Sequence, residues 1–85
     1  MKPFTLIWDE LAVDELAEIW ESAKDRRAIT RACAQIDGLL KATGQQAGIE
    51  IQEGLRSLTV LPLRVIFTAS AEDCLVTVYR VRLLP

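Results

Sequence analysis

A β-hairpin pattern spans residues 54–69, which read GLRSLTVLPLRVIFTA. Two runs of mainly β-branched and apolar residues, 55–60 and 63–69, flank a central proline, Pro62. Proline has no backbone N–H to give to a strand ladder, so Pro62 marks the turn between two strands. Because side chains alternate across a strand, we expect Arg64 on the opposite sheet face from the apolar residues beside it.

The residues before this hairpin predict two helices. Apolar side chains recur at three- and four-residue spacing over about 10–23 and again over about 26–43. We expect Asp9 or Asp14 to cap the start of the first helix and Asp25 to cap the start of the second. Gly44 is expected to end the second helix. Because the link between the helices is short, we expect them to pack together as an antiparallel helical hairpin.

Each predicted helix carries an apolar stripe. In the first helix the stripe comprises Val13, Leu16, Ala17, Trp20 and Ala23. In the second it comprises Ile29, Cys33, Ile36 and Leu40. We expect Trp20 to fill the space between the two helices, since it is the largest side chain of either stripe.

Strands are also expected at about 4–8 and 75–82, whereas residues 49–52 are either a short edge strand or an extended arm. Alternation in the last strand places Leu75, Thr77, Tyr79 and Val81 on one face, and Val76, Val78, Arg80 and Arg82 on the other. The predicted order is β-α-α-β-β-β, an α+β fold with a helical hairpin packed on a small, mainly antiparallel sheet. We expect residues 1–85 to form one domain.

The composition is apolar for so short a chain. Hydrophobic residues make up 51% of the 85 residues, and the mean hydropathy is +0.21. Either the core is dense, or a partner covers part of the apolar surface. No apolar run approaches the roughly 20 residues of a membrane-spanning helix, and no signal peptide is recognisable, so we expect a cytoplasmic protein without a membrane partner.

The residue types present exclude several chemistries. The chain has no histidine, which removes imidazole acid–base catalysis and argues against a zinc site. Its two cysteines, Cys33 and Cys74, lack metal-site spacing and are expected to be reduced. No glycine-rich phosphate loop is present. We therefore expect neither a cofactor nor a metal.

Charge is divided unevenly along the chain. Residues 1–53 hold six Lys or Arg and ten Asp or Glu, whereas residues 54–85 hold four Arg and two acids. The arginines of the second part are Arg56, Arg64, Arg80 and Arg82. Arginine on a sheet can bind phosphate through paired hydrogen bonds. The alternative is that these are surface strand residues or members of ion pairs.

Four short segments stand out against this order of elements: LAEIW at 16–20, IDGLL at 36–40, GLRSL at 54–58 and PLRVIF at 62–67. Together with the order of elements, they resemble the RelE/ParE superfamily of toxins from bacterial type II toxin–antitoxin systems. The resemblance covers nearly the whole chain. It implies a cognate antitoxin whose extended or helical tail lies across the helices and the sheet, and such a partner would account for the surplus of apolar residues.

The resemblance also implies roles for the arginines. RelE-type toxins cleave messenger RNA on the ribosome, and Arg64 matches the hairpin arginine that stabilises the phosphate there. Arg56 matches a position that is often basic. ParE-type toxins instead poison DNA gyrase and are not nucleases. The RelE branch continues past its last strand into a basic segment with a catalytic tyrosine, whereas this sequence reads Leu83-Leu84-Pro85 there.

We therefore expect a toxin, neutralised by an antitoxin, that acts on gyrase or another target without a complete RelE-type nuclease site. Toxins of this kind are associated with plasmid stabilization. One alternative is a ribosome-dependent, metal-independent mRNA endoribonuclease, in which the candidate catalytic residues are Arg64, Arg56, Arg80 and Arg82. The other alternative is a non-toxic interaction module of the same fold, or a homodimer.

Overall fold

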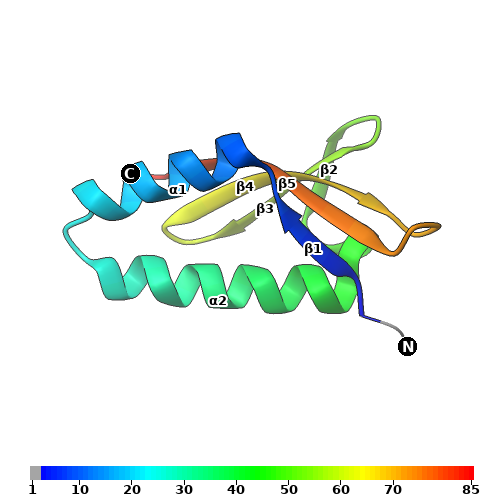
Figure 1. Ribbon diagram of the computed structural model, residues 1–85, viewed down its shortest axis with the longest axis horizontal. Coiled ribbons are helices and arrows are strands. Elements are labelled where there is room, and N and C mark those ends of the chain that lie inside the picture. Colours follow the sequence, from blue (N-terminus) through cyan, green and yellow to red (C-terminus); the bar gives the residue numbers. More distant parts are fainter. Residues whose placement is uncertain (1–2) are drawn as a thin grey trace.

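The computed structural model describes residues 3–85 (Figure 1). Its strands are β1 (Thr5–Trp8), β2 (Ile49–Gln52), β3 (Leu55–Val60), β4 (Leu63–Ser70) and β5 (Leu75–Leu83). Its helices are α1 (Glu10–Ser22), α2 (Arg26–Thr43) and a short 3-10 turn, η1 (Gly44–Gln46). The strands form one sheet in the order β1-β5-β4-β3-β2. Only the β1–β5 pair is parallel.

These elements confirm the expected α+β class and most of the expected boundaries. Residues 49–52 form an edge strand that pairs with β3, which decides between the two alternatives for this segment. Asp9 caps α1, because its carboxylate accepts a hydrogen bond from the Leu11 N–H at 3.2 Å. Asp25 caps α2 in the same way through the Ala28 N–H at 3.1 Å. Gly44 ends α2 with a φ of +48°.

The core lies between α2 and the face of the sheet that turns toward the helices. The stripe predicted for α2 is buried there, with Ile29, Ile36 and Leu40 almost inaccessible to solvent. Opposite them lie Leu63, Val65 and Phe67 of β4, as alternation from the hairpin pattern predicts. The buried residues of β5 are Val76, Val78 and Val81.

The predicted faces of β5 are wrong at its centre. Val78 pairs with Phe67 while Arg80 pairs with Ile66, so one extra residue, Tyr79, stands opposite the β4 ladder. This bulge resets the alternation, because an inserted residue moves every later side chain to the other face. Val76 and Val78 are therefore buried together with Val81, and Tyr79 is exposed.

The predicted role of Trp20 is also wrong. The two helices run antiparallel (Figure 1), but Trp20 is 41% exposed and does not fill the space between them. The reason is the position of α1. Strand β1 pairs only with Leu75–Val78, and α1 continues beside the second half of β5. There it buries Ala12, which is outside the predicted stripe, and leaves three of the five stripe residues exposed: Val13, Ala17 and Trp20.

Candidate functional site

Three of the four candidate arginines share one face of the sheet. Arg64 pairs across strands with Arg82 on one side and with Thr59 on the other. Arg80 lies two residues before Arg82 on β5. Directly opposed residues share a sheet face, so these arginines lie on the face away from the core. Arg56 pairs with Phe67 and belongs to the core-facing side.

Arg56 is engaged in holding the loop between η1 and β2. Its Nε donates a hydrogen bond to the Ala47 carbonyl oxygen at 2.9 Å, and its Nη2 donates to the Gly48 carbonyl oxygen at 3.1 Å. Two charge-assisted bonds to backbone carbonyls fix the end of the loop against β3. The Arg56 guanidinium is thus kept apart from the other three arginines.

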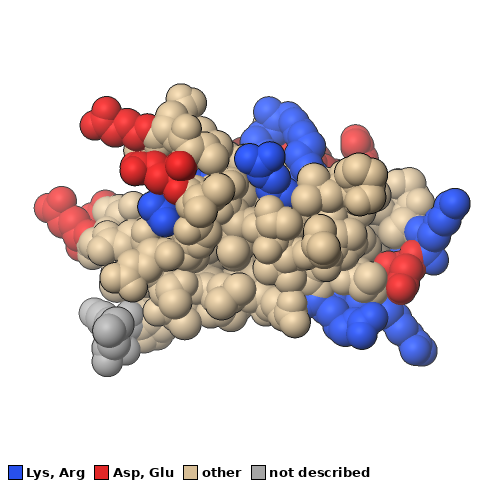
Figure 2. All heavy atoms as spheres, turned by 180° about the vertical axis from the view of Figure 1, so that it is seen from behind, with Lys and Arg blue, Asp and Glu red and all other residues tan. Residues whose placement is uncertain are grey.

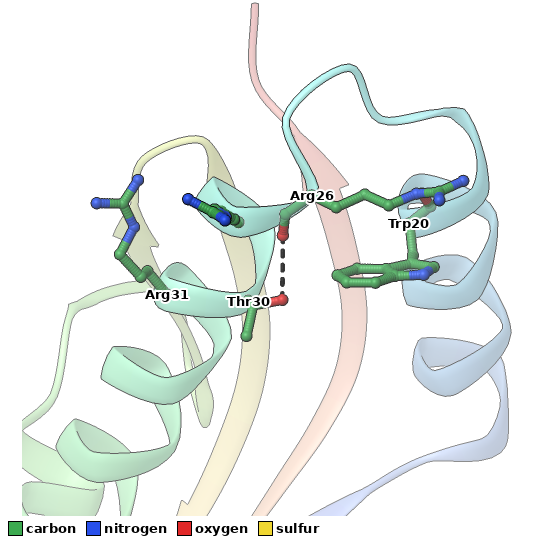
Figure 3. A pocket seen from close by; sticks show the side chains of 5 residues that line it. Trp20, Arg26, Thr30 and Arg31 are labelled. Atoms are coloured by element: carbon green, nitrogen blue, oxygen red, sulfur yellow. Dashed lines mark hydrogen bonds between the residues drawn. The ribbon is translucent and has the colours of Figure 1, made fainter.

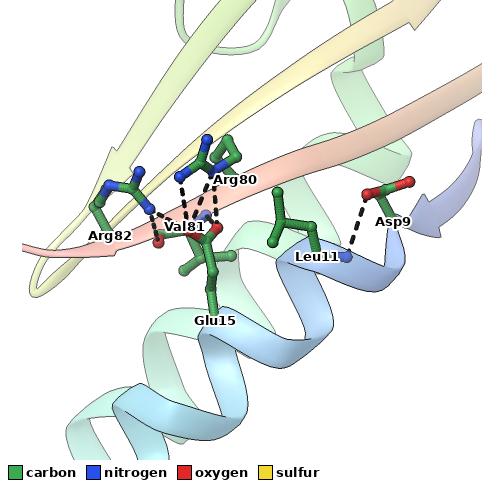
Figure 4. Close-up of polar contacts among 6 residues, drawn as sticks. All are labelled: Asp9, Leu11, Glu15, Arg80, Val81 and Arg82. Carbon is green, nitrogen blue, oxygen red and sulfur yellow. Dashed lines mark hydrogen bonds and ion pairs between the residues drawn. The ribbon is translucent and has the colours of Figure 1, made fainter.

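Arg80 and Arg82 converge on one carboxylate, that of Glu15 in α1 (Figure 4). The Arg80 Nε lies 3.2 and 3.1 Å from the two Glu15 oxygens, and the Arg82 Nη1 also donates to Glu15. The backbone N–H of Val81 donates to Glu15 Oε1 at 3.0 Å. Because β1 no longer pairs with β5 at Val81, the Glu15 carboxylate supplies the acceptor that a neighbouring strand would otherwise provide.

This arrangement strongly favours the ionised form of Glu15. Burial by itself would raise the pKa of the Glu15 carboxyl, but the hydrogen bonds from Arg80, Val81 and Arg82 outweigh it. Together they lower the pKa from its ordinary value of 4.5 to about 2. The carboxylate also separates two like charges on β5 and ties α1 to the sheet. We call Glu15, Arg80, Arg82 and the Val81 N–H the Glu15 cluster.

The depressed pKa of Glu15 predicts a loss of stability in acid. A carboxyl whose pKa is lower in the folded than in the unfolded chain stabilises the fold fully above the unfolded pKa. That contribution is lost as the pH falls from about 5 toward 2. After allowance for the solvent exposure of both arginines, we expect the free energy of unfolding to fall by about 2 kcal/mol over this range.

Urea unfolding between pH 7 and pH 2.5 measures this loss, with Glu15→Gln as the reference. The glutamine variant should lack this part of the pH dependence. Equal pH profiles for the two proteins would contradict the assignment.

Arg64 differs from the other strand arginines. Within residues 3–85, its guanidinium makes no hydrogen bond or ion pair. It lies on the open sheet face beside Arg82, which shares the Glu15 carboxylate with Arg80. A partly exposed, unengaged arginine next to the hydroxyl of Thr59 can bind a phosphate or a carboxylate.

An apolar groove separates α1 from α2. One part, of about 430 Å³, is lined by Val13, Leu16, Ala17, Trp20, Glu21, Ile29, Thr30 and Cys33. A second part continues from it, sharing Val13, Leu16 and Cys33, and reaches Trp8, Ala34 and Asp37. The groove exists because α1 follows the edge of β5 and does not close onto α2. We refer to it as the α1–α2 groove.

The end of this groove near the α1–α2 connection is basic (Figure 3). A hollow lined by Trp20, Thr30, Arg26, Arg27 and Arg31 adjoins the groove through Trp20 and Thr30. The Arg26 guanidinium lies over the Trp20 ring, 5.6 Å from its centre. Its Nε also donates to the Trp20 carbonyl oxygen at 3.0 Å, so Arg26 closes the C-terminal end of α1.

Seen from behind, the molecule is electrostatically uneven. In Figure 2, basic side chains predominate toward the end that holds the α1–α2 connection, and acidic side chains are prominent at the opposite end. Much of the surface between them carries neither charge. In the part of the chain that the structure describes, no helix is long and apolar enough to cross a membrane. The same residues contain no cluster of three or more His, Cys, Asp or Glu suited to a metal ion.

Sequence reasoning missed the role of Glu15, although a signal for it exists. Ala12, Glu15 and Ile19 follow three- and four-residue spacing, so Glu15 lies on the face of α1 that the sheet covers. An acid at such a position requires a cationic partner. The partner itself could not be read from the sequence, because Arg80 lies 65 residues away.

The whole chain is similar to solved toxin–antitoxin structures. The matching chain of the RelBE2 complex from Mycobacterium tuberculosis has a TM-score of 0.78 at 18% identity, over 95% of this chain and 98% of that one. For a chromosomal ParDE system of P. aeruginosa the TM-score is 0.71 at 20% identity, and the match covers 96% of this chain and 97% of that one. For the isolated E. coli RelE toxin the TM-score is 0.67 at 14% identity, and the match covers 96% of this chain and 85% of that one.

No protein-family model matches the sequence, and no curated protein matches it either. These three solved structures are at or below 20% identity, so the likeness is one of fold. It extends over nearly the entire chain and includes representatives of both the RelE and the ParE branch. The chain therefore has the RelE/ParE toxin fold.

Proposed function

We propose that this protein is the toxin component of a toxin–antitoxin pair and is neutralised by a cognate antitoxin. The observation that carries the proposal is the whole-chain fold likeness to RelBE and ParDE, both of which are toxin–antitoxin systems. A second observation agrees with it. The α1–α2 groove leaves large apolar side chains exposed, among them Val13 and Trp20, and such a surface is suited to a protein partner.

The proposed action is on gyrase or another protein target, without a complete RelE-type nuclease site. In support, Arg56 is bound to backbone carbonyls, and Arg80 and Arg82 are bound to Glu15. These arginines would have to leave their partners before they could neutralise an RNA phosphate. Within residues 3–85, the one tyrosine, Tyr79, lies on the β5 bulge.

A second candidate is mRNA cleavage at the ribosome, with Arg64 stabilising the scissile phosphate. The specific observation in its favour is that Arg64 is unengaged within the described residues and lies on the open sheet face. A guanidinium in such a position can stabilise the charge that develops on a phosphate during transesterification.

Induction of the chain alone in a bacterial host tests the proposal. We expect growth arrest, and we expect co-expression of the antitoxin, sought in the adjacent reading frame, to relieve it. DNA supercoiling assays and mapping of mRNA 5′ ends then separate action on gyrase from ribosomal cleavage. Arg64→Ala should abolish mRNA cleavage if Arg64 is catalytic, whereas Arg31→Ala, an exposed arginine of α2, serves as its control. Normal growth with soluble, folded protein would leave only a non-toxic interaction module or a homodimer.

A further inference from the structure

We propose that Arg27 and Arg31 recognise acidic residues at the C-terminal end of an amphipathic antitoxin helix that lies along the α1–α2 groove, and so set the direction of that helix. The inference rests on the proposed function in one respect, that a partner protein covers the groove. It adds the chemistry of the partner segment and its orientation.

The dimensions of the groove fit a short helix. Together with the adjoining basic hollow, its two parts extend along α2 from Arg27 to Asp37, a span of ten residues. At about 1.5 Å per residue this corresponds to roughly 15 Å, or about three helical turns. A partner helix of that length presents three or four apolar side chains on one face, at intervals of three and four residues.

The groove surface is suited to the apolar face of such a helix. Along the floor, Leu16 and Cys33 are half-buried, and Val13 and Trp20 are exposed on the rim. Along the α2 rim, Ala34 and Gly38 have no bulky side chains, and a methyl group added at Gly38 would meet nothing within 4 Å. The missing side chain at Gly38 is therefore not required by internal packing, and it leaves room for the close approach of another backbone.

The charges at the two ends of the groove differ. Within residues 3–85, neither Arg27 nor Arg31 takes part in an ion pair, and both are exposed. In Figure 3, Arg31 extends from α2 into solvent at the basic end. The opposite end holds Asp37, which is paired with Lys41 at 3.9 Å. Glu21 of α1 also lines the groove beside Trp20, but the three arginines of the adjoining hollow outnumber it. The positive charge therefore lies in the hollow, near Arg27 and Arg31.

A helix in this groove has a preferred direction for two reasons. Its C-terminal end carries a partial negative charge of about half an elementary charge from the aligned peptide dipoles. Acidic side chains in its last turn add to that charge and can pair with guanidinium groups. Both effects favour placing the C-terminal end beside Arg27 and Arg31, with the N-terminal end beside Asp37.

The direct test uses two peptides of identical composition. Each is a 12-residue helix with leucines at helical spacing, held helical by a hydrocarbon staple on its solvent face. One carries two glutamates in the last turn and the other carries them in the first turn. By fluorescence anisotropy, we expect the peptide with C-terminal glutamates to bind about tenfold more tightly.

Two pairs of matched variants locate the contact. Arg27→Glu should remove or invert the preference between the peptides, whereas Arg64→Glu, the same charge change on the opposite sheet face, should preserve it. Val13→Arg should abolish binding of both peptides. Leu11→Arg should not, although Leu11 is exposed on the same helix to nearly the same extent, 48% against 49% for Val13.

The outcomes separate the parts of the proposal. Equal affinity of the two peptides, with binding still lost in Val13→Arg, would overturn the charge recognition while leaving the groove as a partner site. Failure of both peptides to bind would overturn the docking proposal as a whole. Growth arrest by the unaccompanied chain does not depend on either result, so the proposed toxin function stands or falls separately.

Discussion

Replacement of Glu15 by alanine is expected to lower the free energy of unfolding by about 3 kcal/mol, because the Glu15 cluster loses its only carboxylate. The Val81 N–H, in a buried residue, then has no acceptor. Arg80 and Arg82 are left as neighbouring like charges. The value lies at the lower end of the range for a broken buried ion pair, since both arginines are about half exposed.

Glu18→Ala is the matched control for Glu15→Ala. Glu18 lies three residues later on the same helix, is exposed, and makes no ion pair within the described part of the chain. Its replacement should change the free energy of unfolding by less than about 0.5 kcal/mol. Urea denaturation at pH 7 measures both. A loss below about 1 kcal/mol for Glu15→Ala would show that α1 is held to β5 by its apolar contacts alone.

Replacement of Gly48 by alanine should destabilise the protein by more than about 3 kcal/mol, and it should detach the β2 edge of the sheet. Gly48 has a φ of +64°, and a Cβ there would overlap the backbone carbonyl oxygen of Ser57. Neither group can move without breaking the β2–β3 pairing. The Gly48 carbonyl also accepts the Arg56 Nη2, so the change would release Arg56 as well.

Gly54→Ala provides the comparison, because Gly54 also has a positive φ, +79°, but open space where a Cβ would stand. It should show only the backbone penalty of about 1–2 kcal/mol. Thermal unfolding, with amide hydrogen exchange of residues 49–57, distinguishes the two variants. Equal destabilisation would mean that the contact with Ser57 relaxes at little cost.

The Glu15 cluster bears on the proposed function as well as on stability. In this protein the outer sheet face presents three arginines, but two of them, Arg80 and Arg82, are already paired with one carboxylate whose pKa is about 2. At physiological pH the carboxylate is therefore always charged. A ribonuclease site that used Arg80 or Arg82 would have to displace Glu15, which makes Arg64 the arginine whose substitution is most informative.

Much of the fold could be predicted from local pattern. The hairpin around Pro62, both helix caps and the buried stripe of α2 depend on residues within a few positions of one another. The same reasoning failed for the faces of β5, where one extra residue at Tyr79 shifts the alternation. A bulge depends on how two strands pair, and the sequence of one strand does not reveal it.

The candidate site was predictable to a smaller degree. The hairpin pattern correctly placed Arg64 on the sheet face opposite its apolar neighbours. It could not show that Arg56 lies on the other side of the sheet, bound to the loop before β2. Which arginines are engaged depends on the acids and carbonyls that folding brings near them.

The sequence by itself determined most of the secondary structure, the α+β class and the apolar surplus, because helix and strand periods arise from short-range geometry. Only the tertiary structure decided where α1 lies. Its position beside the second half of β5 brings Glu15 to Arg80 across 65 residues, and the same position opens the α1–α2 groove. The Glu15 cluster and the α1–α2 groove therefore share one cause, the long-range packing of α1 against β5, which no local sequence pattern encodes.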